Sequence, residues 1–312
     1  MDYASVIDTL KRVDPDKCYP LYVPSVLRPG HFLYRNVIAY LPEWYRKTKV
    51  VYLTRSEWYK RYKQAQPDVR IEVIPKSYEY DGYGTDTTRK CLFDLAYSNG
   101  DEHIFDWDDD IDCLTMAYSS GETTRRLRKE DQHRFAFNLL CLISETSSEA
   151  FDKYPDLCLG QIGRITPSSC GKDFHKTKIT INKGGIPRMS NIINVNRMKA
   201  RGMERTGEFD LQMEDMGIDF KVIGLGGWCF TIPTIMHTVP PIEKNPRTEP
   251  LLHGDEKALW RDGMEKLMKM EAGPYTTYTS LNKRYFGIQR PIGINWIKWN
   301  ADHGLKSIVE EW

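Results

Sequence analysis

Short apolar runs, separated by segments of helical spacing, organise the first third of the chain. Four of these runs are rich in Val, Ile, Tyr or Phe and end in polar or turn-forming residues, which is typical of strands. They are CYPLYVPS (18–25), TKVVYLTR (48–55), VRIEVIPKS (69–77) and EHIFDW (102–107). The spacing between them predicts helices over 31–41, 56–66 and 85–98.

This regular alternation of strand and helix predicts an α/β fold, with a mainly parallel mixed sheet flanked by helices. Ligands of such sheets bind beyond the carboxyl ends of the strands. The acidic stretch IFDWDDDID (104–112) occupies that place after the fourth strand. Its position therefore indicates a ligand-binding site.

Beyond about residue 150 the pattern changes to short strands with glycine turns, predicted within 156–169, 176–189 and 217–230. A further helix is predicted over 256–270, because its apolar residues share one face. No internal repeat is visible, and we expect residues 1–312 to form one domain.

Composition excludes several classes of protein. Lys and Arg together number 44 against 43 for Asp and Glu, so any electrostatic specialisation must be local. The chain has no signal-like start and no run of about 18 apolar residues, so we expect a cytoplasmic protein without a membrane partner. Its seven cysteines form no CxxC pair, which argues against a zinc ribbon or a disulfide framework.

Several interpretations compete for the acidic stretch. Its alternating acids suggest an EF-hand loop, but Ile111 and Ala117 occupy the positions that need glycine and glutamate. A solvated loop or a set of helix caps is the plain structural alternative. Because adjacent carboxylates repel one another unless a cation or hydrogen-bond donors compensate them, the cluster favours a seat for Mg²⁺ or Mn²⁺ with a diphosphate.

An ordered set of motifs makes this interpretation more specific: VPSVLR (23–28), VIPKSYEYDGYGTDTTRK (73–90) and DWDDDI (106–111). Over roughly residues 18–240 this set resembles the GT-A-fold glycosyltransferases associated with TET/JBP-type base oxygenases, mainly from phages. The resemblance implies transfer of a sugar from a UDP-sugar to the hydroxymethyl group of 5-hydroxymethylcytosine in double-stranded DNA. Mn²⁺ or Mg²⁺ is the implied cofactor.

We expect an internal division of this single domain. Residues 18–120 would form a nucleotide-sugar-binding half and 121–240 an acceptor-binding half, whereas 241–312 lies outside the resemblance and is expected, from its apolar and aromatic content, to pack against the rest. For a viral protein, the expected location is the cytoplasm of the host cell.

The family pattern assigns the acidic residues individually. Asp108 and Asp110 match the outer carboxylates of the Asp-x-Asp motif and are the implied metal ligands, with Asp110 preferred for direct contact. Asp109, beside Asp108, would hold ribose or water on the cofactor side. A second register, Asp106-Trp107-Asp108, is also an Asp-x-Asp, but its neighbours make Asp106 look like part of the strand.

Arg28 and Arg89 match basic positions that flank the nucleotide in this family, and Ser25 would add a hydrogen-bond donor there. Arginine suits phosphate because its planar fork donates paired hydrogen bonds and stays charged. The alternative for each arginine is that it is a surface residue without a functional role.

Glu214 and Asp215 resemble the acidic pair at the acceptor in GT-A enzymes. Asp215 is the candidate base for the acceptor hydroxyl, with Glu214 and Asp210 in reserve. The alternative is the start of an amphipathic helix whose acids face water.

His237 follows an apolar run and is the candidate third metal ligand through a neutral ring nitrogen, although a lone histidine is more often structural.

From Gly160 to Gly207 ten Lys and Arg residues stand against two acids, a local balance of 10 − 2 = +8, and RRLRK at 125–129 adds a second basic run. Phosphate backbones are bound by such surfaces. A base that is flipped out of the DNA duplex would need an aromatic side chain of the protein to stack against. The candidates are Trp107, Trp228, Tyr275 and Tyr278.

Two alternatives stay open. The enzyme could act on a polysaccharide, a lipid-linked sugar or a protein, for which a basic surface is not needed. The chain could also be a catalytically inactive nucleic-acid-binding module. The motifs do not decide the sugar, the anomeric outcome, the DNA sequence context or the oligomeric state.

Overall fold

The structure is a computed structural model, and most of the chain is described in it. The described residues are 1–25, 37–76, 85–165, 174–183, 190–207, 209, 214–239, 256–278 and 291–312. Among the predicted site residues, Arg28 and Asp210 lie outside these ranges, and so does the side chain of Glu214.

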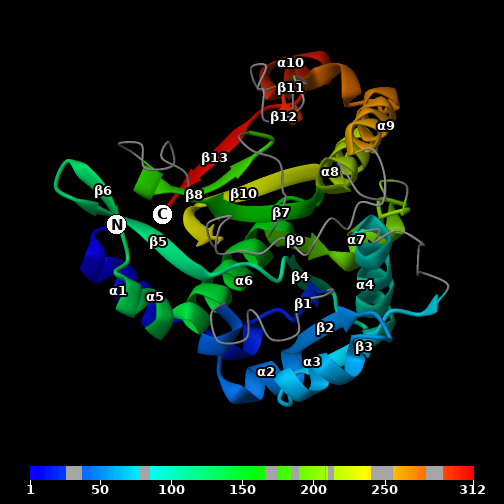
Figure 1. Cartoon of the computed structure of the whole chain (residues 1–312). Helices are drawn as coiled ribbons and strands as arrows, with labels where there is room; N and C mark the ends of the chain where they lie inside the picture. The colour runs from blue at the N-terminus through cyan, green and yellow to red at the C-terminus, as the bar shows by residue number, and fades with distance from the viewer. Residues whose placement is uncertain are drawn as a thin grey trace.

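One sheet of eleven strands runs through the molecule (Figure 1). Its strands are β1 (Leu21–Pro24), β2 (Val50–Thr54), β3 (Arg70–Val73), β4 (His103–Trp107), β5 (Cys113–Ser120), β6 (Thr123–Arg126), β7 (Leu157–Arg164), β8 (Thr177–Ile181), β9 (Ser190–Asn194), β10 (Trp228–Thr238) and β13 (Ile308–Glu311). The order is β13-β8-β10-β7-β9-β4-β1-β2-β3, with β5 paired to β10 and β6 to β5. A separate hairpin joins β11 (Thr276–Tyr278) to β12 (Pro291–Ile294).

The four strands predicted in the first third of the chain are β1 to β4, and they pair in parallel in the order β4-β1-β2-β3. Leu21 of β1 lies opposite Val50 of β2 on one side and Phe105 of β4 on the other. Their carboxyl ends therefore meet at one edge of the sheet. Beyond β4, β9 runs antiparallel between β4 and β7, and β7 pairs in parallel with β10. The predicted α/β class, with a mixed sheet flanked by helices, is confirmed.

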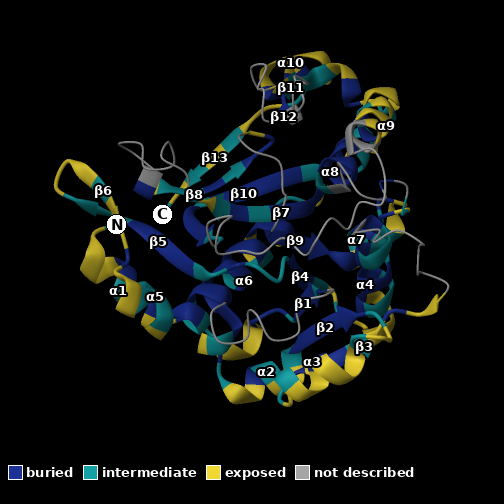
Figure 2. Cartoon of the chain, in the orientation of Figure 1, coloured by how far each residue is buried: buried dark blue, intermediate teal, exposed yellow. Residues whose placement is uncertain are grey.

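Helices cover both faces of this sheet. They are α1 (Tyr3–Lys11), α2 (Glu43–Lys49), α3 (Tyr59–Ala65), α4 (Thr85–Asn99), α5 (Lys129–Arg134), α6 (Ala136–Lys153), α7 (Val195–Ala200), α8 (Glu214–Gly224), α9 (Glu256–Lys269) and α10 (Trp296–Asp302). Leu21 and Val23 of β1 pack into a core with α1, α2 and α6, whereas Tyr22 packs into a second core with α4, α7 and α8. This alternation follows from the period of two along a strand. The central strands are accordingly buried in Figure 2.

Two helices differ from what the sequence pattern predicts. The predicted strand region 217–230 is helical up to Gly224, so the prediction is wrong for its first half. Met216, Ile218 and Phe220 alternate as in a strand, but all three are buried in the second core on a helix that packs on several sides. Helix α6 was not predicted, although its buried residues, among them Leu139, Ile143 and Ala150, recur at helical spacing along one face.

The C-terminal segment packs onto the main domain. The predicted helix over 256–270 is confirmed as α9, and Trp296 and Trp299 of α10 are buried in the second core. The final strand, β13, pairs antiparallel with β8 and so joins the main sheet. No helix in the described ranges has the length and apolar character needed to cross a membrane.

Candidate active site

The acidic stretch spans the end of β4 and the turn that follows it. Asp106 is part of β4 and is 1% exposed, whereas Asp108, Asp109 and Asp110 follow the strand and are partly exposed. This placement agrees with the later of the two Asp-x-Asp registers, because Asp106 belongs to the strand. The turn lies at the carboxyl edge of the parallel strands, where ligands of such sheets bind.

Arg89 is held by the acidic stretch itself. It lies in α4, its side chain is 2% exposed, and its guanidinium pairs with both Asp106 and Asp108. Asn191 of β9 donates a further hydrogen bond to Asp106 at 3.3 Å. A guanidinium shared in this way sets the orientation of the Asp108 carboxylate, so Arg89 acts on this site through Asp108.

Ser25 joins the end of β1 to the same turn. Its hydroxyl donates to Asp109 at 2.6 Å and shares a hydrogen bond of 2.6 Å with the hydroxyl of Tyr62 in α3. Ser25 is 2% exposed, and its backbone N–H bonds to the Leu53 carbonyl. The predicted residues Ser25 and Asp109 are therefore brought together by a direct hydrogen bond.

Asp215 of α8 lies close enough to this turn for its charge to act on Asp108. Burial raises the pKa of Asp108 well above its ordinary value, and the nearby charges of Asp110, Asp215 and Asp109 raise it further, although Arg89 opposes the shift. The Asp108 side chain keeps 27% exposure, so it borders solvent despite these surroundings. Asp108 thus pairs with one arginine and interacts with three further carboxylates, and this excess of negative charge favours a cation.

His237 lies on β10, opposite Leu114 of β5 and beside Arg164 of β7. It is 3% exposed, and neither ring nitrogen has a hydrogen-bond partner among the described residues. Burial and the charge of Arg164 lower its pKa to about 4, so its ring is neutral at ordinary pH and keeps a lone pair. The next residue, Thr238, accepts a backbone hydrogen bond from Asp112 at 2.8 Å, which brings this end of β10 to the acidic stretch.

The donor chemistry of Asp108 and Asp110 fits a hard divalent cation. Mg²⁺ is commonly held by one or two carboxylates and completes its shell with water and substrate phosphate. Within the described ranges, no three His, Cys, Asp or Glu side chains are grouped so that they could hold a metal. The structure therefore gathers the two carboxylates but does not gather His237 with them into one set of ligands.

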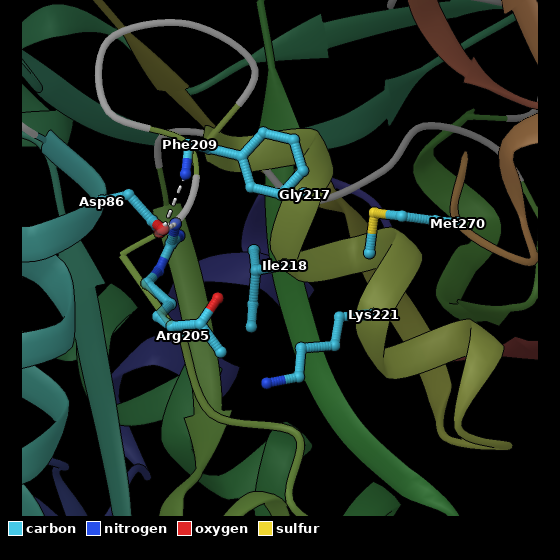
Figure 3. Close-up of a pocket in the computed structure, with 8 residues that line it drawn as sticks. Asp86, Arg205, Phe209, Gly217, Ile218, Lys221 and Met270 are labelled. Carbon is cyan, nitrogen blue, oxygen red and sulfur yellow. Dashed lines mark hydrogen bonds and ion pairs between the residues drawn. The ribbon is translucent and has the colours of Figure 1, made fainter. Parts of the chain in front are cut away.

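A small pocket lies beside the acidic site, against α8 (Figure 3). At one side of it, Asp86 of α4 pairs with Arg205 at 3.0 Å and accepts the backbone N–H of Phe209 at 3.3 Å. Both charged side chains are less than 5% exposed. The sequence pattern singled out Asp86 and Arg205 for no such role, since only the fold brings these residues together.

Much of the predicted basic surface is already paired with groups of the chain itself, mostly at the protein surface. Half of the ten Lys and Arg residues between Gly160 and Gly207 bond to carboxylates or carbonyls of the chain. These are Lys178, Arg197, Lys199, Arg201 and Arg205. Lys172 and Arg188 lie outside the described residues. By contrast, Arg125 and Arg126 of the second basic run are exposed on the β5–β6 hairpin and form no ion pair within the described part of the chain.

One aromatic candidate is unsuited to receive a base. Trp107 is 1% exposed and packs in the first core beside Phe105, with the ring centroids 5.0 Å apart. Tyr278, in contrast, is 36% exposed, and Trp228 and Tyr275 are partly exposed. The structure thus removes Trp107 from the candidates and leaves the other three.

No protein-family model matches the chain, and no curated protein matches it in sequence. Among solved structures, TarS residues 1–349 from S. aureus, also solved with UDP, is similar over 81% of this chain and 66% of that one, at 10% identity and a TM-score of 0.42. GalNAc-T7, solved with UDP, GalNAc and Mn²⁺, is similar over 93% of this chain and 55% of that one, at 13% identity and a TM-score of 0.46. A CMP:2-keto-3-deoxy-manno-octonic acid synthetase with CTP covers 71% of this chain and 90% of its own, at 8% identity and a TM-score of 0.37.

Similarity at this level identifies no family and carries no activity from those proteins to this one. The strand order and the position of the acidic turn instead define the class. A parallel β3-β2-β1-β4 unit is followed by the antiparallel strand β9, with Asp108 to Asp110 at the carboxyl end of β4. This is an α/β domain of the predicted GT-A-like type.

Proposed function

We propose that this protein is a metal-dependent glycosyltransferase that moves a sugar from a UDP-sugar to the hydroxymethyl group of 5-hydroxymethylcytosine in DNA. The transferase reaction is supported above all by one observation: Asp108, Asp109 and Asp110 follow β4 at the carboxyl edge of the parallel strands, with Asp108 paired to Arg89 and Asp109 bonded to Ser25. Asp215 of α8 is near enough for its charge to act on Asp108, which is compatible with an acceptor side next to this turn.

On the donor side, Asp108 and Asp110 would hold Mn²⁺ or Mg²⁺, which supplies Lewis-acid stabilisation of the diphosphate as it leaves the sugar. Asp109 and Ser25, joined at 2.6 Å, hold the end of β1 against this turn, and the loop that follows Ser25 in the sequence is the proposed nucleotide-binding loop. Arg28 lies in that loop by sequence and is the proposed phosphate contact.

On the acceptor side, Asp215 is the proposed base. It accepts the proton of the hydroxymethyl group while the oxygen bonds to the anomeric carbon and the bond from that carbon to the diphosphate breaks. UDP leaves with the electron pair of that bond. Glu214 and Asp210 are the reserve candidates, and in a retaining reaction the same carboxylates would contact the acceptor or the sugar.

The DNA acceptor is supported by the ordered motifs that resemble the 5-hydroxymethylcytosine glycosyltransferases and by the exposed arginines of the β5–β6 hairpin. Arg125 and Arg126 are available to bind phosphate, whereas half of the basic residues of 160–207 are engaged within the fold. A polysaccharide, lipid-linked sugar or protein acceptor is the second candidate, and an inactive nucleic-acid-binding module the third.

The test is nucleoside mass spectrometry of digested 5-hydroxymethylcytosine DNA after incubation with the protein, Mn²⁺ and a panel of UDP-sugars. We expect a hexose, N-acetylhexosamine or pentose increment that is absent with Asp110→Ala. UDP release without an increment would retain the transferase and exclude this acceptor. If neither a DNA product nor UDP appears, the inactive binding module is favoured.

A further inference from the structure

Five charged side chains of alternating sign are linked in series beneath the acidic turn. Arg205 lies 3.0 Å from Asp86 and 4.0 Å from Asp106. Asp106 pairs in turn with Arg89, and Arg89 pairs with Asp108. The first four side chains of this buried charge chain are less than 5% exposed, and only Asp108, at 27%, borders solvent.

The same chain of charges also reaches α8. Asp86 accepts the backbone N–H of Phe209 at 3.3 Å, and the ring of Phe209 lies against Gly217 of α8. Figure 3 shows Asp86, Arg205 and Phe209 grouped beside this helix. Asp215 is two residues before Gly217. The series therefore begins beside the helix of the proposed base and ends at a proposed metal ligand.

Stability is a weak reason for such an arrangement. Removing paired charges from water costs several kcal/mol for each ion, and a well-packed apolar replacement is often as stable or more stable. Apolar residues in place of Asp86, Arg205 and Asp106 would, however, leave the side chains of Arg89 and Asp108 without a fixed orientation. Arg205 suits its place between Asp86 and Asp106 because its planar guanidinium can approach both carboxylates at once. The single ammonium group of a lysine does this less well.

We propose that Arg205 and Asp86 are positioning residues of the transferase site. Through Asp106 and Arg89 they hold the Asp108 carboxylate in its orientation, and through Phe209 they hold the start of α8. This inference rests on the proposed function, since it assumes that Asp108 serves a metal–diphosphate complex. Neither residue touches the substrate in this role, so their effect appears first in binding of the metal and nucleotide.

The experiment measures Mn²⁺ affinity in the presence of UDP, from the free-Mn²⁺ signal in electron paramagnetic resonance, for wild type, Arg205→Met and Arg205→Lys. Residues that support a metal ligand from behind typically contribute about 10- to 100-fold to affinity, so we expect about a tenfold loss or more in Arg205→Met. Arg205→Lys keeps the charge but not the fork and should recover part of the affinity. Arg197→Lys is the control, because the Arg197 guanidinium donates only to the Tyr154 and Leu157 carbonyls among the described residues.

Each result bears on the inference. Wild-type affinity in folded Arg205→Met would overturn it, and so would an equal loss in Arg197→Lys, which would indicate general destabilisation. If Arg205→Met does not fold, wild-type affinity in Arg205→Lys would overturn it instead. If the wild-type protein itself binds no Mn²⁺ with UDP, the proposed function fails and this inference fails with it. Normal binding without sugar transfer would count against the acceptor alone.

Discussion

The ring of Phe209 lies so close to Gly217 that a Cβ at position 217 would meet the ring carbons at 2.5 Å. Gly217 is in the first turn of α8, two residues after Asp215, the proposed base. Glycine is therefore required here by close approach and not by backbone conformation. The contact fixes the distance between α8 and the segment that leads into it.

We expect Gly217→Ala to destabilise the protein, although alanine normally favours a helix by about 1 kcal/mol over glycine. Forcing a methyl group into a packed contact costs about 1–3 kcal/mol, so the net loss should be about 1 kcal/mol. Thermal unfolding measures it. Gly224→Ala is the matched control in the same helix, because its Cβ would meet Glu271 at an ordinary 3.4 Å. Equal melting temperatures for both variants would show that Phe209 moves aside freely.

Asp215→Asn should separate binding from chemistry. The amide cannot accept the proton of the acceptor hydroxyl, so we expect kcat to fall by about 10²- to 10⁴-fold. The affinity for UDP with Mn²⁺ should stay near that of wild type or improve, because one charge that opposes ionised Asp108 is removed. Single-turnover kinetics on modified DNA, with UDP binding measured by calorimetry, provides both values. An unchanged kcat would transfer the role of base to Glu214 or Asp210.

The hairpin arginines predict a specific dependence on salt. Each phosphate contact contributes about 0.9 to the slope of log affinity against log salt on duplex DNA. The double variant Arg125→Gln, Arg126→Gln should therefore lower that slope by about 2 if each arginine binds one phosphate. Fluorescence anisotropy over a salt series provides the slope.

The control for the hairpin variant changes the net charge equally at another place. Lys266 and Lys269 lie on α9 and pair with Asp262 and Glu265. Lys266→Gln, Lys269→Gln should leave the slope almost unchanged. A reduction of the same size in both variants would show that DNA senses only the overall charge of the protein.

His103 predicts a loss of stability in acid. It opens β4, stacked between Tyr19 and Phe151 with ring centroids 5.0 and 4.9 Å away, and burial lowers its pKa from an ordinary value of 6.5. The unfolded chain therefore binds the proton more readily than the folded one. Its contribution to stability is present above about pH 6.5 and is lost as the pH falls below that value.

The variant His103→Phe keeps the aromatic stack and removes the titration. The fall in melting temperature between pH 7 and pH 5 should be smaller in this variant, by about 1–2 °C for each 1 kcal/mol that the histidine contributes in a chain of this length. His237, whose pKa is lowered to about 4, acts in the same direction but is present in both proteins. Parallel pH curves for the two proteins would contradict this assignment.

The first third of the fold was predictable because its local patterns agree with its tertiary environment. Each strand from β1 to β4 is short, apolar and bounded by turns, and each was predicted in the correct place. Helix α8 was not, since alternating Met216, Ile218 and Phe220 imitate a strand when burial surrounds a helix. Helix α6 was missed for another reason, since Leu139, Ile143 and Ala150 do recur at helical spacing but were not recognised as a helix.

The sequence by itself determined that Asp108, Asp109 and Asp110 follow a buried strand at the carboxyl edge of a parallel sheet. It determined this because strand patterns and acidic runs are local features. Only the tertiary structure decided which charges remain available there. Arg205, counted by sequence as part of a basic surface, is buried against Asp86, and Arg89 is shared between Asp106 and Asp108. Pairing of this kind depends on residues up to 119 positions apart, and no local pattern encodes such distances.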